Sequence, residues 1–380
     1  MLDSEIKHTP LYEFHLAHGA KMVEFAGHAL PVQYQDGVLR EHLHTRKSAS
    51  LFDVSHMGQV VIRPDGISLD DLCLALESLA PVDVLGLADN RQRYGFLTNE
   101  AGGILDDFMF AKRPGELFLV VNGARRDDDI SHLQTHLPAG CEIEVLFERR
   151  GLIALQGPVS ENALARLCSD VRDMRFMDIR DLDLAGHACW VSRSGYTGED
   201  GFEISTPINA TAEVARALTE SGIVRPAGLG ARDSLRLEAG LCLHGSDIDE
   251  KTTPVEADLT WAIQRVRRPG GEREGGYPGA DFIGAQISGG ADRVRVGLAP
   301  AGRAPMRSGA EIFPDMESAE PIGIVTSGGF GPSVNAPVSV GYVKTQFSDP
   351  GTTVAVEVRN RRLSASIASL PFVRPKYLRR

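Results

Sequence analysis

The sequence predicts an α+β protein that ends in a separate all-β unit. Short helical and strand-like segments alternate irregularly through about residue 260, which favours mixed α+β domains over a regular βαβ repeat. A segment dense in glycine, proline and charge follows at 267–280. Beyond it lie short alternating strands with glycine-rich turns, which are typical of a compact β-barrel or sandwich. The length of 380 residues fits roughly two or three domains.

Three segments carry the signals of helices, at 8–19, 71–82 and 160–171. In the first, Thr9 is suited to cap the helix and Pro10 stands at the position that proline prefers. The other two place apolar residues at i, i+3, i+4 and i+7, which is the stripe of a helix packed on a core. The stripes consist of Leu69, Leu72, Cys73 and Leu76, and of Leu164, Leu167, Cys168 and Val171.

Strand-like runs are short, rich in β-branched and aromatic residues, and bounded by turn residues. They divide into a group between the helices and a group after the glycine-rich segment. We therefore expect a mixed α+β region at 1–266, a linker at 267–290 and a β-barrel at 291–380. The runs lie at 94–100, 104–112, 116–123, 141–147 and 151–157, and at 293–299, 322–330, 337–343, 352–360 and 362–370.

The net charge of −11 argues against nucleic-acid binding and against binding to anionic membranes, because both need a basic face. No apolar run approaches the roughly 18 residues of a membrane-spanning helix. The N-terminus shows neither a signal pattern nor an arginine-rich transit peptide. We expect a cytoplasmic protein, or a mature organellar form that has lost its transit peptide. A local basic patch is present near the C-terminus, comprising Arg359, Arg361, Arg362, Arg374, Lys376, Arg379 and Arg380.

The five cysteines argue against a disulfide framework and a thiolate zinc site, because their number is odd and none forms a CxxC pair. Cys73 and Cys168 lie on helical apolar stripes, so we expect them in the core. His132 and His136 are spaced i, i+4, but no HExxH motif surrounds them, so we expect an exposed helix face there. The pair His42 and His44 is expected to be ordinary, since two-residue spacing specifies little.

Several common catalytic signatures are absent from the sequence. There is no GxxxxGK[ST] phosphate loop, and no GxGxxG follows a strand; the segment AGLGARD at 227–233 fails the spacing. There is also no GxSxG nucleophile elbow. These absences argue against phosphate-loop, dinucleotide-binding and serine-nucleophile enzymes.

Two carboxylates interrupt the apolar run NEAGGILDDFMF at 99–110. If this run is a strand, Asp106 and Asp107 point to opposite faces, so they do not form a close acid–base dyad. One of them is expected to enter a cavity. From spacing alone, the simpler alternative is an edge strand with one solvated carboxylate and one that caps a loop amide.

Two further segments place polar residues in a way that fits a ligand. In RSGYTGEDGFEIS at 193–205, Phe202 and Ile204 share one face of a strand and Glu203 takes the other. A glutamate there can accept two N–H groups of an aminopyrimidine, although a solvent-facing strand residue is the simpler interpretation. A helix is expected to start near Ala231. Arg232 then lies in its first turn, where cations oppose the helix dipole, which hints at a bound partner.

These segments together resemble the aminomethyltransferase (T-protein) family of the glycine cleavage system. The resemblance begins with TPLYEFHLAHGAKMVEFAGHALPVQY and continues through LFDVSHM, NEAGGILDD and SGYTGEDGFEIS. It runs on through ARDSLRLEAGLCLHGSDIDEKTTPVEA and ends with VTSGGFGPS, VGYV and PFVRPKY. Long motifs in the family's order cover nearly the whole chain. The glycine-rich insertion near 267–280 is the one departure, and it touches no matched motif.

The resemblance implies a fold and a reaction. The fold is a three-domain cloverleaf of two mixed α+β domains and a C-terminal β-barrel around a central folate channel. In the reaction, the lipoyl-bearing H-protein presents an aminomethyl group on a dihydrolipoyl sulfur, and the one-carbon unit passes to tetrahydrofolate. Ammonia leaves, and 5,10-methylenetetrahydrofolate and dihydrolipoyl H-protein form. The family uses tetrahydrofolate as a co-substrate, and no metal, flavin or nicotinamide.

The resemblance also implies roles for eight residues. Asp107 resembles the catalytic aspartate beside folate N5 and N10, where a carboxylate can stabilise a cationic carbon and handle a proton. By the same resemblance Asp106 serves the fold. Glu203 matches the glutamate that holds the folate ring, and Trp261 either packs against the ligand or is a buried core residue. The other implied folate-binding residues are Arg232, Tyr377, Tyr94, Tyr196, Asn122 and, less directly, Met57.

Three alternatives compete with this interpretation. A folate-dependent demethylating oxidase would carry a fused flavin domain, and no dinucleotide fingerprint is present. A non-catalytic tetrahydrofolate-binding module that assists iron–sulfur assembly would carry Lys-Gly-Cys-Tyr-x-Gly-Gln-Glu; here Cys242 sits in GLCLHG instead. A purely structural protein would need no polar cavity. The H-proteins of the family are acidic, so docking would need a local positive surface, which we expect at the basic C-terminus.

Overall fold

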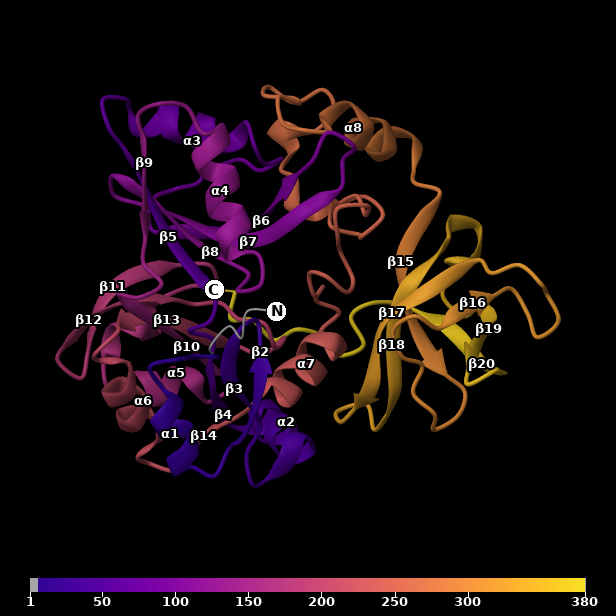
Figure 1. Ribbon diagram of the computed structural model, residues 1–380, viewed down its shortest axis with the longest axis horizontal. Helices are drawn as coiled ribbons and strands as arrows, with labels where there is room; N and C mark the ends of the chain where they lie inside the picture. The colour runs from indigo at the N-terminus through magenta and orange to yellow at the C-terminus, as the bar shows by residue number, and fades with distance from the viewer. Residues whose placement is uncertain (1–5, 380) are drawn as a thin grey trace.

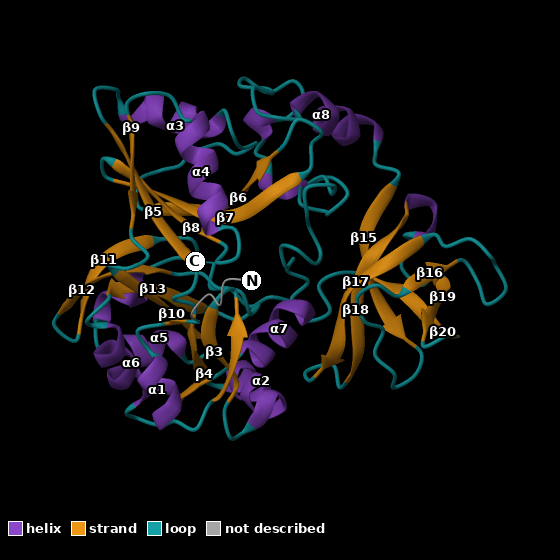
Figure 2. Cartoon of the chain, viewed as in Figure 1, coloured by secondary structure: helices purple, strands orange, loops and turns teal. Residues whose placement is uncertain are grey.

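The computed structural model describes residues 6–379. Figure 1 shows three groups of elements: one built on a six-stranded sheet, one on a five-stranded sheet, and a barrel at the C-terminal end. Figure 2 shows that helices lie against the two sheets, whereas the barrel consists almost entirely of strands and loops. The predicted fold class, mixed α+β domains followed by a β-barrel, is confirmed.

The six-stranded sheet is covered on both faces. Ile153 and Leu155 of its central strand pack with helices α1, α5 and α6 in one core. Leu152 and Ala154 alternate with them and pack against helix α7 on the other side. The strand order is β11 (Ile179–Leu184), β12 (His187–Ser192), β13 (Gly201–Pro207), β10 (Arg150–Gln156), β4 (Ala49–Asp53) and β14 (Val224–Pro226). The helices are α1 (Tyr12–Ala17), α5 (Ser160–Leu164), α6 (Thr211–Thr219) and α7 (Leu229–Glu238).

The alternation along β13 sets the direction of Glu203. Phe202 and Ile204 are fully buried in the core formed with α1, α5 and α6. Glu203 therefore lies on the opposite face, where α7 covers the sheet. The predicted division of FEIS between two faces is confirmed.

A small three-stranded sheet and helix α2 (Gly37–Lys47) complete this unit. In the sheet, β3 (His28–Gln33) lies between β1 (Lys7–His8) and β2 (Lys21–Phe25). Helix α2 packs against α7, and its His42 is fully buried between Ser234, Glu238 and Ser333. No observation gives His42 a functional role, so the expectation that it is ordinary stays a prediction. Its partners lie 192, 196 and 291 residues along the chain, so no local pattern indicated them.

The five-stranded sheet carries the two adjacent aspartates. Phe108 and Phe110 of β7 pack under helix α3 in a second core, so Asp106 shares their helix-covered face. Asp107 and Met109 point to the other face. The strand order is β6 (Arg91–Thr98), β7 (Ile104–Arg113), β8 (Glu116–Val121), β5 (Gly58–Pro64) and β9 (Cys141–Val145), and the helices are α3 (Leu69–Glu77) and α4 (Arg126–His136).

The segment 267–290, expected to be a linker, contains helix α8 (Ala280–Gly289). Gly279 precedes the helix with a φ of 76°, a conformation that favours glycine, and Ile283 is fully buried and anchors it. The glycine-rich loop before α8 is tied to the five-stranded unit. Arg267 donates to the Glu77 carbonyl oxygen at 2.8 Å, and Arg273 Nε donates to the Glu77 carboxylate at 3.0 Å. Short 3-10 turns precede the loop at Thr260–Ala262 and Arg265–Arg267.

The C-terminal strands close into a six-stranded barrel around its own apolar core. Closure removes the free sheet edges that short alternating strands would otherwise expose. The order around the barrel is β15 (Arg293–Pro300), β18 (Ala336–Lys344), β17 (Gly323–Gly331), β16 (Glu311–Phe313), β19 (Thr353–Val358) and β20 (Arg361–Ala368), with a 3-10 turn at Thr345–Phe347.

After the barrel, the chain returns to the six-stranded unit, as the yellow segment in Figure 1 shows. The amide of Val373 donates to the carbonyl oxygen of Glu238, and that of Lys376 donates to the carbonyl oxygen of Gly198. The amide of Phe176 donates to Leu378. These bonds bring Tyr377 beside the loop that carries Tyr196.

All three predicted helical segments are longer than the helices in the structure, and α3 ends at Glu77 rather than at residue 82. The first segment forms only α1 (Tyr12–Ala17), because residues 7 and 8 pair with β3 instead. The segment 160–171 forms α5 and then a 3-10 turn at Ser169–Asp173, yet Leu164 and Val171 are both fully buried. Cys73 is buried in the core as expected, while Cys168 is partly buried against it.

Within residues 6–379, no helix is long and apolar enough to cross a membrane. The same residues contain no group of three or more His, Cys, Asp or Glu side chains placed to hold a metal ion.

Candidate active site

Asn122, directly after β8, joins the two adjacent aspartates. Its side-chain amide donates to Asp106 Oδ1 at 2.8 Å and to Asp107 Oδ1 at 2.7 Å. Its backbone amide also donates to Asp106 Oδ2 at 3.3 Å. Asp106 and Asp107 belong to opposite faces of β7, as predicted, but one amide reaches both carboxylates. Asp106 is fully buried and Asp107 is partly buried.

Tyr94 of β6 completes the surroundings of Asp107. Its hydroxyl group donates to Asp107 Oδ2 at 3.0 Å. Burial, and then the negative charge of Asp106, raise the pKa of Asp107 to about 6. A carboxylate whose pKa lies this close to neutral pH is well suited to accept and return a proton.

Trp261 stacks on Tyr94, with ring centroids 5.5 Å apart and an interplanar angle of 24°. The side chain is 61% exposed, so the alternative that Trp261 is a buried core residue is wrong. An aromatic surface of this size left open beside Tyr94 is available to a flat ligand.

Glu203 and Arg232 face each other from β13 and α7. The carboxylate of Glu203 accepts a hydrogen bond from Ser194 Oγ at 2.6 Å. Arg232 is the fourth residue of α7, in the first turn as predicted. Its Nη1 atom is buried and has no hydrogen-bond partner among residues 6–379. Burial lowers the pKa of Arg232, while the charges of Tyr196 and Glu203 oppose this shift.

Tyr196 and Met57 lie beside Arg232. The Arg232 guanidinium carbon lies 4.7 Å from the centre of the Tyr196 ring, and its Nη2 lies 4.0 Å from Met57 Sδ. The Tyr196 hydroxyl group donates to the Cys242 carbonyl oxygen. Tyr377 stacks on Phe176 at 4.4 Å, and burial raises the pKa of Tyr377 to about 12.

Six of the eight predicted residues fall into two contacting sets. Asp107 accepts hydrogen bonds from both Tyr94 and Asn122. Arg232 contacts Tyr196 and Met57. Burial raises the pKa of Tyr196, the charge of Arg236 opposes this shift, and the charge of Asp107 adds to it. No observation on the structure assigns a role to any of these residues, so the individual roles stay predictions.

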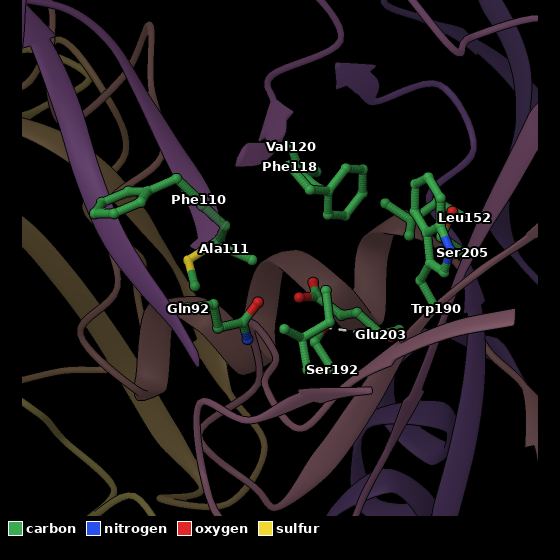
Figure 3. Close-up of a pocket in the computed structure, with 12 residues that line it drawn as sticks. Gln92, Phe110, Ala111, Phe118, Val120, Leu152, Trp190, Ser192, Glu203 and Ser205 are labelled. Atoms are coloured by element: carbon green, nitrogen blue, oxygen red, sulfur yellow. Dashed lines mark hydrogen bonds between the residues drawn. The ribbon is translucent and has the colours of Figure 1, made fainter. Parts of the chain in front are cut away.

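A small cavity between the two sheets lies beside this region. Figure 3 shows Glu203 and Trp190 reaching it from the six-stranded sheet, and Gln92 and Phe118 from the five-stranded sheet. Its volume is about 10 Å³, which is room for about one water molecule. Of the eight predicted residues, only Glu203 lines it, so this cavity is not the binding site for a large ligand.

Three titratable residues near the site were not predicted. His244 Nδ1 lies 3.5 Å from Asp106 Oδ1, and its Nε2 is buried with no partner among the described residues. Asp129 of α4 is buried and faces Asp106. Burial lowers the pKa of His56 to about 3, and the charge of Arg232 adds to this shift. Asp129 was not predicted because it stands in the run RDDDIS, where only the tertiary fold decides which aspartate is buried.

Comparisons with known proteins place the whole chain in one family. Residues 11–267 match the family described as the GCVT N-terminal domain, and residues 293–374 match the glycine cleavage T-protein C-terminal barrel domain. The chain is 44% identical to "Aminomethyltransferase, mitochondrial" of Flaveria anomala over 99% of this chain and 91% of the relative. It is 43% identical to the protein of the same name from Homo sapiens, over 98% and 91%.

A solved structure shares the complete fold. It is the glycine cleavage system aminomethyltransferase T from Bartonella henselae, which superimposes with a TM-score of 0.90 at 40% sequence identity. The match covers 98% of this chain and 99% of that one.

Proposed function

The chain belongs to the glycine cleavage T-protein family and is an aminomethyltransferase of the glycine cleavage system, and from this premise we propose how its residues carry the reaction. Asp107 is the catalytic residue. Glu203, Arg232 and Tyr377 hold tetrahydrofolate, with Tyr94, Tyr196, Asn122 and Met57 lining its site. The lipoylated H-protein supplies the aminomethyl group.

The observation that carries the folate assignment is the buried, unpartnered Nη1 of Arg232. A buried cation without a partner is costly, so such an atom indicates a group that arrives with the ligand. Glu203 lies near it with a carboxylate that accepts one hydrogen bond, from Ser194. An acceptor and a donor side by side fit the N–H and carbonyl edges of an aminopyrimidinone ring.

The proton count of the reaction defines what Asp107 does. The N–H groups of N5 and N10 lose one proton each when the methylene bridge forms. One of these protons ends on the dihydrolipoyl sulfur, and the other converts released ammonia to ammonium. With a pKa of about 6, Asp107 accepts a proton and returns it near neutral pH. Its negative charge also stabilises the cationic carbon during transfer.

Tyr94 and Asn122 keep Asp107 in one orientation, because they donate to different oxygens of its carboxylate. A fixed carboxylate needs no reorganisation when charge develops on the substrate. The exposed ring of Trp261 extends this site outwards from Tyr94, so it offers a stacking surface for the substrate.

The H-protein is proposed to dock on the basic C-terminal surface. Arg374, Lys376 and Arg379 are exposed there, and the Arg379 guanidinium lies 5.6 Å from the centre of the Phe176 ring. Because both proteins are acidic overall, a local positive patch would guide the encounter. Arg380, which belonged to the same expectation, lies outside the described residues.

The compartment of the protein stays a prediction. The relatives compared above are named mitochondrial, which lends no support to a cytoplasmic location. A mature organellar form is the proposal that agrees with those names.

The decisive experiment measures ammonia release from aminomethyl-loaded H-protein, with and without tetrahydrofolate. We expect release that depends on tetrahydrofolate in the wild type and collapses in Asp107→Asn. Binding of tetrahydrofolate without ammonia release would support a non-catalytic folate-binding module instead. Full activity in Asp107→Asn would remove Asp107 from its role, and Asp106→Asn is the variant that would then be compared.

A further inference from the structure

Helix α4 begins with three aspartates in very different surroundings. The Asp127 and Asp128 side chains are 86% and 65% exposed, as expected for carboxylates in the first turn of a helix. Asp129 is only 2% exposed. It projects beneath the five-stranded sheet toward Asp106, which is fully buried on the same face.

The two buried carboxyl groups are hydrogen-bonded to each other. Carboxylates are acceptors only, so such a bond requires a proton on one partner. Burial, followed by the hydrogen bond and the charge of Asp106, raises the pKa of Asp129 to about 10. The second oxygen, Asp129 Oδ2, is buried without a partner among residues 6–379. Asp106, in contrast, accepts two hydrogen bonds from Asn122, one from the side-chain amide and one from the backbone amide.

Charged and titratable groups face this pair of carboxyl groups from several elements. Asp107 faces Asp106 through the shared amide of Asn122, and Asp128 adds a further negative charge near Asp129. Arg125 acts in the opposite direction on Asp129, and His244 Nδ1 lies 3.5 Å from Asp106. Asp106 and Asp129 are buried and Asp107 is partly buried, and three carboxylates this close together cannot all remain ionised.

We propose that Asp129 is a protonated positioning residue, which donates its proton to Asp106 and thereby fixes, through the amide of Asn122, the orientation and charge environment of Asp107. The proposal rests on the role of Asp107 proposed above. Asp129 touches no substrate and acts only through Asp106 and Asn122. The negative charge of Asp106 raises the pKa of Asp107, so the proton that Asp129 shares with Asp106 limits this rise.

The first test compares Asp129→Asn with Asp129→Leu. An asparagine keeps a neutral donor for Asp106, whereas leucine has a similar volume and no donor. We expect Asp129→Leu to lower kcat about tenfold or more, with KM for tetrahydrofolate changed less than about threefold. The acid limb of its pH–rate profile should move upward, because Asp106 is less neutralised. Asp129→Asn should have a kcat close to that of the wild type and an unchanged acid side of the pH–rate profile. The matched control is Asp127→Asn, which makes the same change at an exposed position.

Each contrary result would overturn the proposal. If Asp129 is ionised, Asp129→Asn removes a negative charge and moves the acid limb downward. If the hydrogen bond serves no catalytic purpose, Asp129→Leu keeps the wild-type kcat and pH profile. An Asp129→Asn variant as slow as Asp129→Leu would refute hydrogen-bond donation as the role of Asp129, because an amide also donates.

A second measurement needs no substrate and remains valid if Asp129→Leu does not fold. Infrared spectra of wild type and Asp129→Asn are compared at about pH 8, where ordinary carboxyl groups are ionised. The C=O stretching band of a protonated carboxyl group should be present in the wild type and absent from the variant. Its absence from the wild type would refute the protonated state of Asp129, whatever reaction the protein catalyses. If the band is present but the protein shows no folate-dependent activity, the protonated state of Asp129 stands and the proposed function is wrong.

Discussion

Two arginines one turn apart on helix α7 are buried in opposite ways. Arg236 donates to Asp233 at 2.8 Å, to Asp247 at 2.5 Å and to Ser327 of the barrel at 3.0 Å. Arg232 contacts the sulfur of Met57 and the ring of Tyr196, and its Nη1 has no hydrogen-bond partner among residues 6–379. The same helix therefore presents one satisfied and one unsatisfied guanidinium.

The difference separates two tasks of the helix. The Arg236 side joins α7 to the barrel through its hydrogen bond to Ser327. It also compensates the charge of Asp247, which is fully buried. The Arg232 side leaves a buried guanidinium nitrogen without a hydrogen-bond partner among the described residues, which costs stability in the ligand-free protein. Changes on the Arg236 side should therefore act on folding, and changes on the side of Arg232 and Asp107 should act on binding and catalysis.

The largest effect is expected from Asp107→Asn. An amide cannot accept the substrate proton, so kcat should fall about 10²- to 10⁴-fold. The measurement is the rate of tetrahydrofolate-dependent ammonia release from loaded H-protein. The circular dichroism and the midpoint of urea unfolding should stay close to those of the wild type. A variant that loses both activity and fold would remove the proposed separation between the two sides.

The sequence predicted much of the arrangement that separates the site residues from the core residues. Strand alternation alone placed Glu203 opposite Phe202 and Ile204, and Asp107 opposite Asp106. The shared bond with Asn122 was not visible, because it depends on the ends of two neighbouring strands meeting in the sheet. The roles of these residues came from the family resemblance, since spacing by itself favoured a solvated strand residue at both positions.

Three features of the structure were not predicted from the sequence, each for a physical reason. The stripe Leu164, Leu167, Cys168 and Val171 correctly indicated a side that packs on the core, but a 3-10 turn replaces the second half of the helix. A 3-10 turn also brings residues i and i+3 to one side, so the apolar pattern does not distinguish the two. Helix α8 was missed because its glycine content resembles that of a loop. Asp129 was missed because its neighbours Asp127 and Asp128 have the same charge and remain in water.

Arg236→Met tests whether Arg236 stabilises the folded protein. Removing this cation leaves Asp247 buried without its partner, so the free energy of unfolding should fall by about 3–5 kcal/mol. Urea denaturation measures this change. The matched control is Arg225→Met, because Arg225 forms an exposed pair with Asp36 at 3.3 Å and should lose less than about 1 kcal/mol. Equal losses in the two variants would contradict the structural role of Arg236.

Arg232→Met is the corresponding change on the ligand side. Methionine keeps an apolar stem and removes the unpaired charge, so ligand-free stability should not decrease. The Kd for tetrahydrofolate should rise about 10- to 100-fold, because a charged hydrogen bond to the ligand is lost. Isothermal titration with tetrahydrofolate, beside urea unfolding, separates the two effects. Unchanged affinity with reduced stability would reverse the assignment of this side.

The pH dependence of the rate tests the surroundings of Asp107 more finely. As the pH falls through about 6, the Asp107 carboxylate takes up a proton and can no longer accept one from the substrate. The value of kcat should therefore decline below this pH and reach a plateau above it. In Asp106→Asn the neighbouring negative charge is absent, so the midpoint should move to lower pH. A midpoint that moves upward would contradict the electrostatic link between the two aspartates.

The smallest effect is expected at Arg379, a cation that lies outside the site and, among the described residues, has no ion pair. Arg379→Glu should weaken the apparent affinity for H-protein about two- to threefold at low salt, and less at high salt, since exposed charges are screened. The KM for H-protein in the ammonia assay measures it. Arg303→Glu on an exposed barrel loop makes the same change in net charge and should have no effect. Equal effects would mean that overall charge, rather than the C-terminal surface, guides docking. An effect confined to Arg379 would instead show that the position of this exposed cation matters, as the position of the buried Arg232 is proposed to matter for the folate ligand.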